Sequence, residues 1–334
     1  MVVGIITQPL LNNYGGVLQN YALQTVLNHL GYSSKTVDWL PPKTPLYRYI
    51  LSWIKTILLN LVGKKRNFVK MQKKYHRKKF VNAFIQDYIA KTTTNYGLSS
   101  GVLSNTQCLI VGSDQVWRPK YNPNISNMFL DFCKKKKKLK RIAYAASFGV
   151  DVWEYSPKQN KICSLLAKKF DAISVREESG IRLCKDYLGV NATWVLDPTL
   201  LLKKEDYQLI CKEVPFCKEE YLAVYVLDEN EKVTAAYEKE AISRRLVVKK
   251  FYADSKSTLT IPEWLAMFRD ASYVVTDSFH GTIFSIIFGK EFKCVYNEGR
   301  GAARFESLLN LYNSGKLEEM REFSLNWLKK ALES

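Results

Sequence analysis

The chain alternates between short apolar runs and longer segments whose apolar residues recur every three or four positions. Apolar runs rich in β-branched and aromatic residues predict buried strands, and the longer period predicts amphipathic helices. We expect strands at 2–7, 35–39, 108–111, 141–144, 171–175, 221–227, 246–251, 273–276 and 292–296. We expect helices at 17–29, 46–62, 66–90, 231–243, 262–268, 282–288, 305–311 and 318–332.

This alternation of strands and helices predicts an α/β fold with mostly parallel sheets. A fresh strand–helix series begins near residue 220, after a proline, Pro198, that would suit a hinge. We therefore expect two doubly wound domains with a cleft between them. The predicted boundaries are 1–200, with a basic helical insertion at 46–90; 201–312, which carries a polar turn at 278–281; and a C-terminal helix at 313–334.

Composition narrows the class of protein. With 334 residues, 47% hydrophobic and 25% charged, the chain is globular and long enough for two domains. Seven scattered cysteines without a CxxC pair predict a reduced, intracellular protein that has neither disulfides nor a cysteine zinc site. The chain starts as a strand, and no apolar run reaches the ~18 residues of a membrane span, so we expect a cytoplasmic protein.

The net charge of +18 comes from two short segments. Residues 64–79 hold nine Lys or Arg and no acid, and residues 134–141 hold seven more, which leaves +2 for the rest of the chain. Basic patches can bind nucleic acid. The sequence contains no nucleic-acid recognition motif, so we expect no nucleic-acid partner.

The predicted helix at 46–62 has apolar residues along one face and runs directly into the basic segment 64–79. An apolar face bordered by Trp and Tyr, with lysines beside it, is typical of a helix that lies in a membrane interface. It is equally typical of a helix packed on its own domain, next to a solvated basic helix. Peripheral contact with the inner face of a membrane through residues 46–79 is therefore one of two interpretations.

The stretch from Ser272 to Gly289 combines a strand, a polar turn and a helix start. In open α/β sheets, ligands bind beyond the carboxyl ends of the strands, where a helix N-terminus favours an anion. His280 lies in this turn and could move a proton near neutral pH, and Gly281 beside it allows close approach of a ligand. The alternative is a histidine that merely caps the helix or fills the core.

Other polar residues follow predicted strands in the same way. Asp114 and Gln115 come soon after 108–111, and Arg176 is the first charge after the strand that ends at Val175. A guanidinium there suits a phosphate or a carboxylate, although Arg176 could instead pair with Glu177 or another nearby acid. Asp114 and Gln115 would point into the same crevice as the residues at other strand ends.

Gly15 and Gly16 start the first predicted helix, where exposed backbone N–H groups can approach a phosphate or a sugar. The pair could equally be a plain tight turn between strand and helix. It does not form a GxGxxG sequence, so the dinucleotide fingerprint is absent. Residues 299–304 read as a flexible, basic loop, and no set of residues with metal-ligand spacing is visible.

Eight segments together resemble one family. They are NNYGGVLQNYALQ (12–24), GSDQVW (112–117), RIAYAASFG (141–149), ISVREESG (173–180), VLDPTLLL (195–202), EWL (263–265), TDSFHGTIFSIIFGKEF (276–292) and RFESLL (304–309). Their order and spacing, over about residues 2–310, resemble the polysaccharide pyruvyl transferases, and GSDQVW and SFHG are the more specific signals. The resemblance implies a GT-B-like fold of two Rossmann-like domains. It also implies transfer of pyruvate from phosphoenolpyruvate to a sugar hydroxyl, usually as a cyclic ketal, in the assembly of surface polysaccharide or exopolysaccharide.

This resemblance leads to a hypothesis for the site. His280 would act as the acid that protonates phosphoenolpyruvate, and Asp114 would orient or deprotonate the acceptor hydroxyl. The donor would be held by Arg176, Arg304, Ser278, Phe279 and Gly281, and the acceptor by Asn13, Gly15, Gly16 and Gln115. Some family members carry a basic residue one or two positions before the histidine, where this chain has Ser278-Phe279, so phosphate binding would depend on backbone N–H groups and other arginines. We expect no metal and no cofactor beyond the phosphoenolpyruvate co-substrate, and a saccharide acceptor that is free or lipid-linked.

Two other functions fit the same sequence. A GT-B glycosyltransferase that uses a nucleotide sugar would place a diphosphate at the same helix terminus, and fold alone does not separate the two reactions. A non-enzymatic binding protein would instead use the basic patches and would not need His280.

Overall fold

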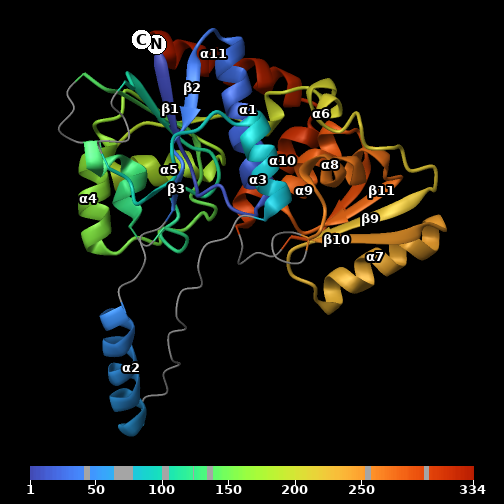
Figure 1. The fold of residues 1–334 in the computed structure, drawn as a ribbon, viewed down its shortest axis with the longest axis horizontal. Coiled ribbons are helices and arrows are strands. Elements are labelled where there is room, and N and C mark those ends of the chain that lie inside the picture. The colour runs from blue at the N-terminus through green and yellow to red at the C-terminus, as the bar shows by residue number, and fades with distance from the viewer. Residues whose placement is uncertain are drawn as a thin grey trace.

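The structure, a computed structural model, describes residues 1–40, 46–63, 78–99, 105–122, 124–133, 138–252, 257–296 and 301–334. Two main sheets organise it, and every strand pairing in them is parallel (Figure 1). The first has the order β2-β1-β5-β6-β7-β8 and consists of β1 (Val2–Ile6), β2 (Ser33–Thr36), β5 (Cys108–Val111), β6 (Lys140–Ala146), β7 (Ala172–Val175) and β8 (Thr193–Trp194). The second has the order β10-β9-β11-β12 and consists of β9 (Tyr221–Val226), β10 (Val247–Tyr252), β11 (Tyr273–Thr276) and β12 (Glu291–Cys294). The expected α/β fold of two doubly wound, Rossmann-like sheets is confirmed.

Helices connect the strands and cover the sheets. In the first half they are α1 (Tyr14–His29), α2 (Leu46–Leu61), α3 (Lys79–Tyr88), α4 (Pro157–Ala167) and α5 (Ser179–Leu183), with shorter turns η2 (Ile125–Phe129), η3 (Asp131–Cys133), η4 (Cys184–Leu188) and η5 (Pro198–Leu200). In the second half they are α6 (Lys204–Ile210), α7 (Glu231–Arg244), α8 (Ile261–Asp270), α9 (Phe279–Ile287), α10 (Ala302–Asn313) and α11 (Leu317–Glu333). A small pair of strands, β3 (Trp39–Leu40) and β4 (Asn95–Tyr96), completes the fold.

Both faces of each sheet are buried, which explains why the strands read as continuous apolar runs. Successive side chains of a strand point to opposite faces. In β5, Ile110 packs in the cluster that contains α1, whereas Leu109 packs in the cluster that contains α4. In β9, Tyr225 faces α8 and Leu222 belongs to the cluster that contains α7.

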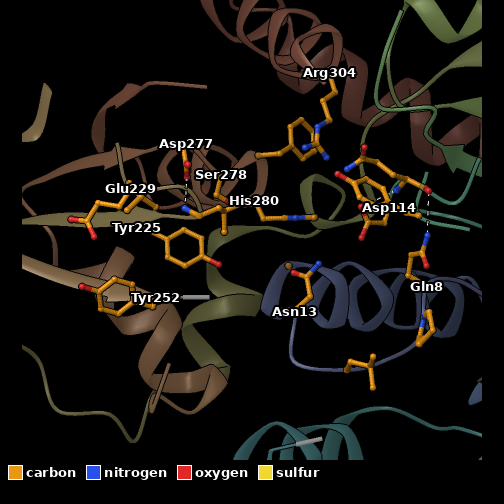
Figure 2. Close-up of a pocket in the computed structure, with 18 residues that line it drawn as sticks. Gln8, Asn13, Asp114, Tyr225, Glu229, Tyr252, Asp277, Ser278, His280 and Arg304 are labelled. Atoms are coloured by element: carbon orange, nitrogen blue, oxygen red, sulfur yellow. Dashed lines mark hydrogen bonds between the residues drawn. The ribbon is translucent and has the colours of Figure 1, made fainter. Parts of the chain in front are cut away.

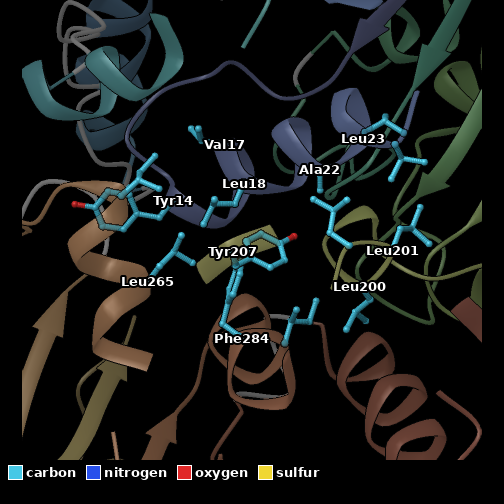
Figure 3. Packing of buried hydrophobic residues seen from close by; sticks show 14 of the residues in the cluster. Tyr14, Val17, Leu18, Ala22, Leu23, Leu200, Leu201, Tyr207, Leu265 and Phe284 are labelled. Atoms are coloured by element: carbon cyan, nitrogen blue, oxygen red, sulfur yellow. The ribbon is translucent and has the colours of Figure 1, made fainter. Parts of the chain in front are cut away.

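One hydrophobic cluster runs through both halves of the chain. Helix α1 lies between the sheets, and its Leu18 and Ala22 pack near Tyr207 and Phe284 of the second half (Figure 3). The Tyr14 hydroxyl donates to Ser257 Oγ (2.7 Å), so a polar contact also crosses between the halves. Because apolar burial is the main stabilising term of a fold, the two sheets are held together by a common core.

The C-terminal helix α11 returns to the first sheet. Ser324 Oγ accepts from the Leu196 N–H (2.9 Å), and Lys140 Nζ donates to the Leu332 carbonyl (2.9 Å). The first sheet therefore includes contacts from the far end of the chain. The domain boundaries at 1–200, 201–312 and 313–334 stay predictions.

The strand predicted at 35–39 is wrong in detail. The chain leaves the first sheet after Thr36, and Trp39 instead begins β3, which pairs with β4. The Asp38 N–H donates to Thr92 Oγ1 (3.0 Å), so a side chain replaces the ladder partner at this point. Local propensity alone does not reveal such a change of partner.

Several helices begin earlier than predicted. Helices α1 and α9 begin directly after their N-caps, Asn13 and Ser278, which places Gly15, His280 and Gly281 inside first turns. Helix α10 begins at Ala302, so Arg304 lies in a helix and the prediction of a loop there is wrong.

Helix α8 begins at Ile261 after its cap Thr260, so Pro262 is its second residue and not its first. Of the predicted helix at 66–90, residues 66–77 lie outside the described part, as do residues 134–137 of the second basic segment. No helix within the described ranges is long and apolar enough to cross a membrane.

Candidate active site

A cavity of about 490 Å³ lies where the two halves of the chain face each other (Figure 2). It is lined from the first half by Gln8, Pro9, Leu11, Asn13, Gly15, Asp114, Gln115 and Tyr121, and from the second by Tyr225, Val226, Leu227, Glu229, Tyr252, Asp277, Ser278, Phe279, His280 and Arg304. The cleft expected between the domains is therefore present, at the carboxyl ends of β1, β9 and β10.

The structure brings most of the predicted site residues to this cavity. Eight line it: His280, Asp114, Ser278, Phe279, Arg304, Asn13, Gly15 and Gln115. Arg176 lies behind the wall, where it is almost fully buried. Gly16 and Gly281 serve the helix starts instead: Gly16 N–H donates to the cap Asn13 (3.2 Å), and Gly281 N–H donates to the cap Ser278 (3.3 Å).

His280 is held in one place by backbone on two sides. It is the second residue of α9, and its side chain is buried apart from a small exposed part at the cavity wall. A Cβ on Gly15 would lie only 2.2 Å from His280 Nδ1, so the start of α1 contacts the imidazole closely. Only glycine fits at this position without displacing the ring.

A buried carboxylate, Asp197, lies behind the histidine. Its Oδ2 is 3.8 Å from His280 Nε2 and accepts a hydrogen bond from Arg176 Nη1 at 2.6 Å. Its Oδ1 accepts from both the N–H (3.0 Å) and the hydroxyl (2.6 Å) of Thr199, so Asp197 caps η5. His280 Nε2 itself is buried and has no hydrogen-bond partner among the described residues, so its hydrogen-bonding capacity is left unsatisfied.

Both arginines lie close to the same aromatic ring, that of Phe279. The guanidinium carbon of Arg176 is 4.6 Å from the Phe279 ring centroid, and that of Arg304 is 5.1 Å from it. Guanidinium groups stack favourably on aromatic faces. The residue before the histidine therefore positions both cations.

The pKa values of the two buried arginines are shifted in opposite directions. Burial lowers the pKa of Arg176, but the carboxylates of Asp197, Asp114 and Glu177 more than offset it, so its pKa is raised. Burial lowers the pKa of Arg304 to about 10, and the positive charge of Arg176 adds to the effect. A negative ligand beside Arg304 would relieve the cost of keeping that guanidinium charged.

The imidazole of His280 is also in an environment that disfavours its charged form. Burial is the largest cause of its lowered pKa, and Arg176 and Arg304 add to it, whereas Asp197 and Asp114 oppose it. The resting protein therefore holds a mainly neutral imidazole at pH 7, and an anion bound beside it would raise the pKa again.

Asp114 occupies a sharp turn after β5. Its φ is +68°, in the left-handed region that few residues other than glycine, Asn and Asp adopt. Its Oδ1 accepts from the Gln115 N–H (2.8 Å) and is 3.5 Å from Arg176 Nη2. The carboxylate thus lies in the cavity wall, linked to the same buried network as His280.

A comparison with models of protein families identifies the family of this chain. A model of the family described as polysaccharide pyruvyl transferase matches residues 13–299, which include most of the chain and most of the residues that line the cavity. The chain belongs to the polysaccharide pyruvyl transferase family. It is therefore a transferase of polysaccharide biosynthesis.

Solved structures of similar shape include UDP-GlcNAc 2-epimerases. One from Neisseria meningitidis, bound to UDP-GlcNAc, is 10% identical over 99% of both chains, with a TM-score of 0.48. A putative enzyme of this kind from Listeria monocytogenes is 10% identical over 97% of this chain and 93% of its own, with a TM-score of 0.47. One from Methanocaldococcus jannaschii, in complex with UDP-GlcNAc and UDP, is 10% identical over 87% and 83%, with a TM-score of 0.44. Among curated protein sequences, none matches this chain.

Sequence reasoning missed one central residue of the candidate site, Asp197. We interpreted the Asp197-Pro198 pair as a hinge, but Pro198 is buried in η5, and the segment packs into the common core. An Asp followed by Pro and Thr, directly after an apolar run, is a pattern typical of an N-cap. That pattern could have identified the cap, although not its contact with Arg176.

Four polar residues of the second half also line the cavity without having been predicted as site residues. They are Tyr225, Glu229, Tyr252 and Asp277. Asp277 accepts hydrogen bonds from the N–H groups of Leu227 (2.6 Å) and Asp228 (2.9 Å), so it shapes the loop after β9. In Figure 2, Tyr225, Tyr252 and Glu229 lie on one side of His280 and Asp114 on the other.

Within the described ranges, no three His, Cys, Asp or Glu side chains are grouped so that they could hold a metal ion. The polar groups of the cavity are instead carboxylates, hydroxyls, amides and guanidiniums. These groups can hold an anion, orient hydroxyls and move protons.

Proposed function

We propose that this protein transfers pyruvate from phosphoenolpyruvate to the hydroxyls of a sugar, forming a cyclic pyruvate ketal in the assembly of a surface polysaccharide or exopolysaccharide. One observation supports the proposal most strongly. In a member of the pyruvyl transferase family, a buried imidazole whose Nε2 has no hydrogen-bond partner among the described residues lies at the same cavity wall as the Arg304 guanidinium, whose charged form is disfavoured by burial. A small, strongly negative donor would complement both groups.

The donor would bind at the start of α9. Its phosphate or carboxylate would pair with Arg304, and Arg176 would add positive charge from behind Phe279. The first N–H groups of a helix lack intrahelical partners, and the helix dipole favours negative charge there. Ser278 already accepts the Gly281 N–H, which leaves the N–H groups of Phe279 and His280 for the donor.

In the first step, His280 would deliver a proton to the methylene carbon of phosphoenolpyruvate, which becomes a methyl group. The neighbouring carbon becomes oxocarbenium-like and a sugar hydroxyl adds to it, losing its proton to Asp114. The carbon–oxygen bond to phosphate then breaks, and phosphate leaves with the bridging oxygen. A second hydroxyl closes the ketal on the same carbon. Of the two hydroxyl protons, one replaces the proton that His280 gave and the other leaves with phosphate.

The lowered pKa of His280 is compatible with this role. The donor brings negative charge to a site where burial disfavours the imidazolium, so donor binding and proton uptake should occur together. A positioned proton donor accelerates a reaction by about 10²–10⁴-fold. Stabilisation of charge by the arginines and the helix terminus should contribute at least as much.

The test is release of inorganic phosphate from phosphoenolpyruvate by the purified protein in the presence of a saccharide acceptor. We expect phosphate release that depends on the acceptor and falls by at least about 10²-fold in His280→Ala. Silence with phosphoenolpyruvate, together with turnover of a UDP-sugar, would favour a nucleotide-sugar glycosyltransferase instead. Full biological activity of His280→Ala would favour a non-enzymatic binding protein.

We also propose that the protein works in the cytoplasm, at the inner face of the membrane, on a saccharide that is free or lipid-linked. All seven cysteines are unpaired thiols in the structure, which is typical of a reducing compartment. Cell fractionation tests this location. Recovery of the protein from an extracytoplasmic fraction would contradict it.

A further inference from the structure

Helix α2 exposes an apolar face that the rest of the fold does not use. Leu51, Leu58 and Leu61 are 60%, 59% and 77% exposed, and Leu46, Ile50 and Ile54 are exposed as well. Figure 1 shows this helix apart from the two sheets. An exposed apolar surface of this kind marks an interaction site.

The exposed apolar residues of α2 share one side of the helix. At 3.6 residues per turn, positions 46, 50, 54, 57, 58 and 61 fall within about half of the circumference. Thr56 is buried on the other side, and Lys55 is exposed near the border of the apolar face. The helix is therefore amphipathic with its apolar side outward, which is the reverse of a helix packed on its own domain.

The sequence around α2 contains basic residues but no acidic ones. Residues 39–86 contain twelve Lys or Arg and not one Asp or Glu, although they make up about a seventh of the chain. These twelve charges equal two thirds of the net charge of +18. Any partner of the apolar face must therefore tolerate a dense field of positive charge.

Charge decides between the possible partners of α2. A second copy of this chain would bring two such basic segments together, and they would repel each other. A nucleic acid would neutralise the lysines but would leave the leucines and isoleucines in water. An anionic bilayer surface accepts both, because acyl chains bury the apolar face and acidic headgroups attract the lysines.

We propose that α2 is a docking helix that lies flat in the interface of an anionic membrane. Its 16 residues would extend about 24 Å along the surface. Lying flat agrees with the finding that no described helix is suited to cross a bilayer. The proposal concerns a surface outside the cleft and does not depend on which reaction the cleft performs.

The insertion that carries α2 is attached at the cleft. On its N-terminal side, Trp39 Nε1 donates to the Thr7 carbonyl (2.9 Å), and on its C-terminal side, the Lys78 N–H donates to Asn12 Oδ1 (2.8 Å). The residues between Thr7 and Asn12 include Gln8 and Leu11, which line the cavity. Docking of α2 would therefore tether this wall of the cavity to the lipid surface.

Co-sedimentation with vesicles tests the proposal directly. The full chain is mixed with vesicles of phosphatidylcholine alone or of phosphatidylcholine with phosphatidylglycerol. We expect binding to the mixed vesicles that weakens as salt is added, and at least about tenfold weaker binding to phosphatidylcholine alone.

A matched pair of variants separates apolar insertion from charge. Ile57→Glu places a carboxylate on the apolar face of α2, and Ile242→Glu makes the same change at an exposed isoleucine of α7. We expect at least about tenfold weaker vesicle binding for Ile57→Glu and a change within about twofold for Ile242→Glu. Thermal unfolding of both variants should match the unchanged protein, since neither side chain belongs to a buried cluster.

Three results would overturn the proposal. The unchanged chain could stay in the supernatant with both kinds of vesicle, or the two variants could bind vesicles equally. Sedimentation velocity without vesicles could show a dimer that Ile57→Glu dissociates, which would identify a second copy as the partner. His280→Ala should bind vesicles like the unchanged chain, so failure of the proposed reaction and failure of the docking proposal give different results.

Discussion

At the scale of single residues, the site depends on how closely His280 is surrounded. Gly15 contacts one edge of the imidazole, and Asp197 lies 3.8 Å from its Nε2. The guanidinium carbons of Arg176 and Arg304 lie 4.6 Å and 5.1 Å from the ring centroid of Phe279, the neighbour of His280. The imidazole is therefore closely packed by its neighbours on these sides.

Gly15→Ala should disable the enzyme while leaving it folded. A methyl group there would come within 2.2 Å of the imidazole, so the ring must move, and small displacements in an active site can cost about 10²-fold in rate. Gly16→Ala is the matched control, because its methyl group would meet only the Asn13 side chain, at 3.3 Å or more. We expect kcat to fall by about 10²-fold in Gly15→Ala and by less than about tenfold in Gly16→Ala, measured by phosphate release. Equal losses in the two variants would contradict close packing on His280.

The pH profile should show the lowered pKa of His280. The pH dependence of kcat/KM reports the pKa values of the free protein. If the reaction needs the protonated imidazole, kcat/KM should fall tenfold per pH unit above an inflection point. That inflection should lie below 6.5, the usual pKa of histidine. Bound donor raises this pKa, so kcat should inflect at a higher pH than kcat/KM. Ionisation of phosphoenolpyruvate itself can also cause an inflection in these profiles. It can be recognised because that inflection would persist in His280→Asn. A kcat/KM that rises with pH through this region would assign His280 the role of a base.

At the scale of elements, η5 and β7 meet in a buried ion pair. Arg176 follows β7, and its partner Asp197 caps η5 and also accepts from Ser113 Oγ (3.1 Å). Burial would raise the pKa of Asp197, but Arg176, His280 and Thr199 together more than offset this effect and lower the pKa to about 2. This carboxylate therefore stays ionised in the folded protein.

Asp197→Asn should destabilise the fold strongly. It leaves the buried guanidinium of Arg176 without its main counter-charge, and removing one partner of such a pair costs about 3–5 kcal/mol. Glu240→Gln is the matched control, since it also removes one carboxylate, from a partly exposed pair with Arg244 and Lys293, and should cost under about 1 kcal/mol. Urea unfolding measures both free energies. An Asp197→Asn cost no larger than that of Glu240→Gln would contradict the account of this pair.

The stability that Asp197 provides depends on pH in a definite direction. Its pKa is depressed from 3.8 in the unfolded chain to about 2 in the folded one, so its contribution is complete above about pH 4–5. It is lost as the pH falls through that window toward 2. Asp197→Asn should therefore unfold with less dependence on pH between 4 and 2 than the unchanged chain.

The elements that could be predicted from the sequence are those defined by local pattern. Strands such as β5 and β9 are continuous apolar runs because both of their faces are buried, and a run of that kind is visible without the fold. The helix starts could not be placed, because a helix begins directly after a capping residue such as Ser278 and so includes the polar residues that follow the cap. Arg304 was assigned to a loop for the same reason: glycines precede it, yet α10 already begins at Ala302.

Single residues of the candidate site could be predicted from the sequence, whereas the ion pairs that join them could not. Side chains after strands converge at one edge of a parallel sheet, so His280 and Asp114 could be grouped in advance. The ion pair of Arg176 and Asp197 joins residues 21 positions apart, and no local pattern announces it. Whether Arg176 pairs with its neighbour Glu177 or with Asp197 is decided by the packing of η5 against β7.

At the scale of the whole molecule, two sheets share one core and enclose one cavity. The first half supplies Asp114 and Gly15, and the second supplies His280 and Arg304. Neither half alone contains the groups that the proposed reaction needs. The motifs of the pyruvyl transferase family lie at strand ends in both halves, so the resemblance to the family extends over most of the chain.

The central claim is that an imidazole in this cavity protonates the methylene carbon of phosphoenolpyruvate while a sugar hydroxyl adds to the neighbouring carbon. The most direct measurement is mass spectrometry of the pyruvylated saccharide made in D₂O. The account predicts one deuterium in the ketal methyl group for each pyruvate transferred, and no such product from His280→Ala. A product without deuterium in that methyl group, or a saccharide that gains a sugar unit and no pyruvate, would contradict it.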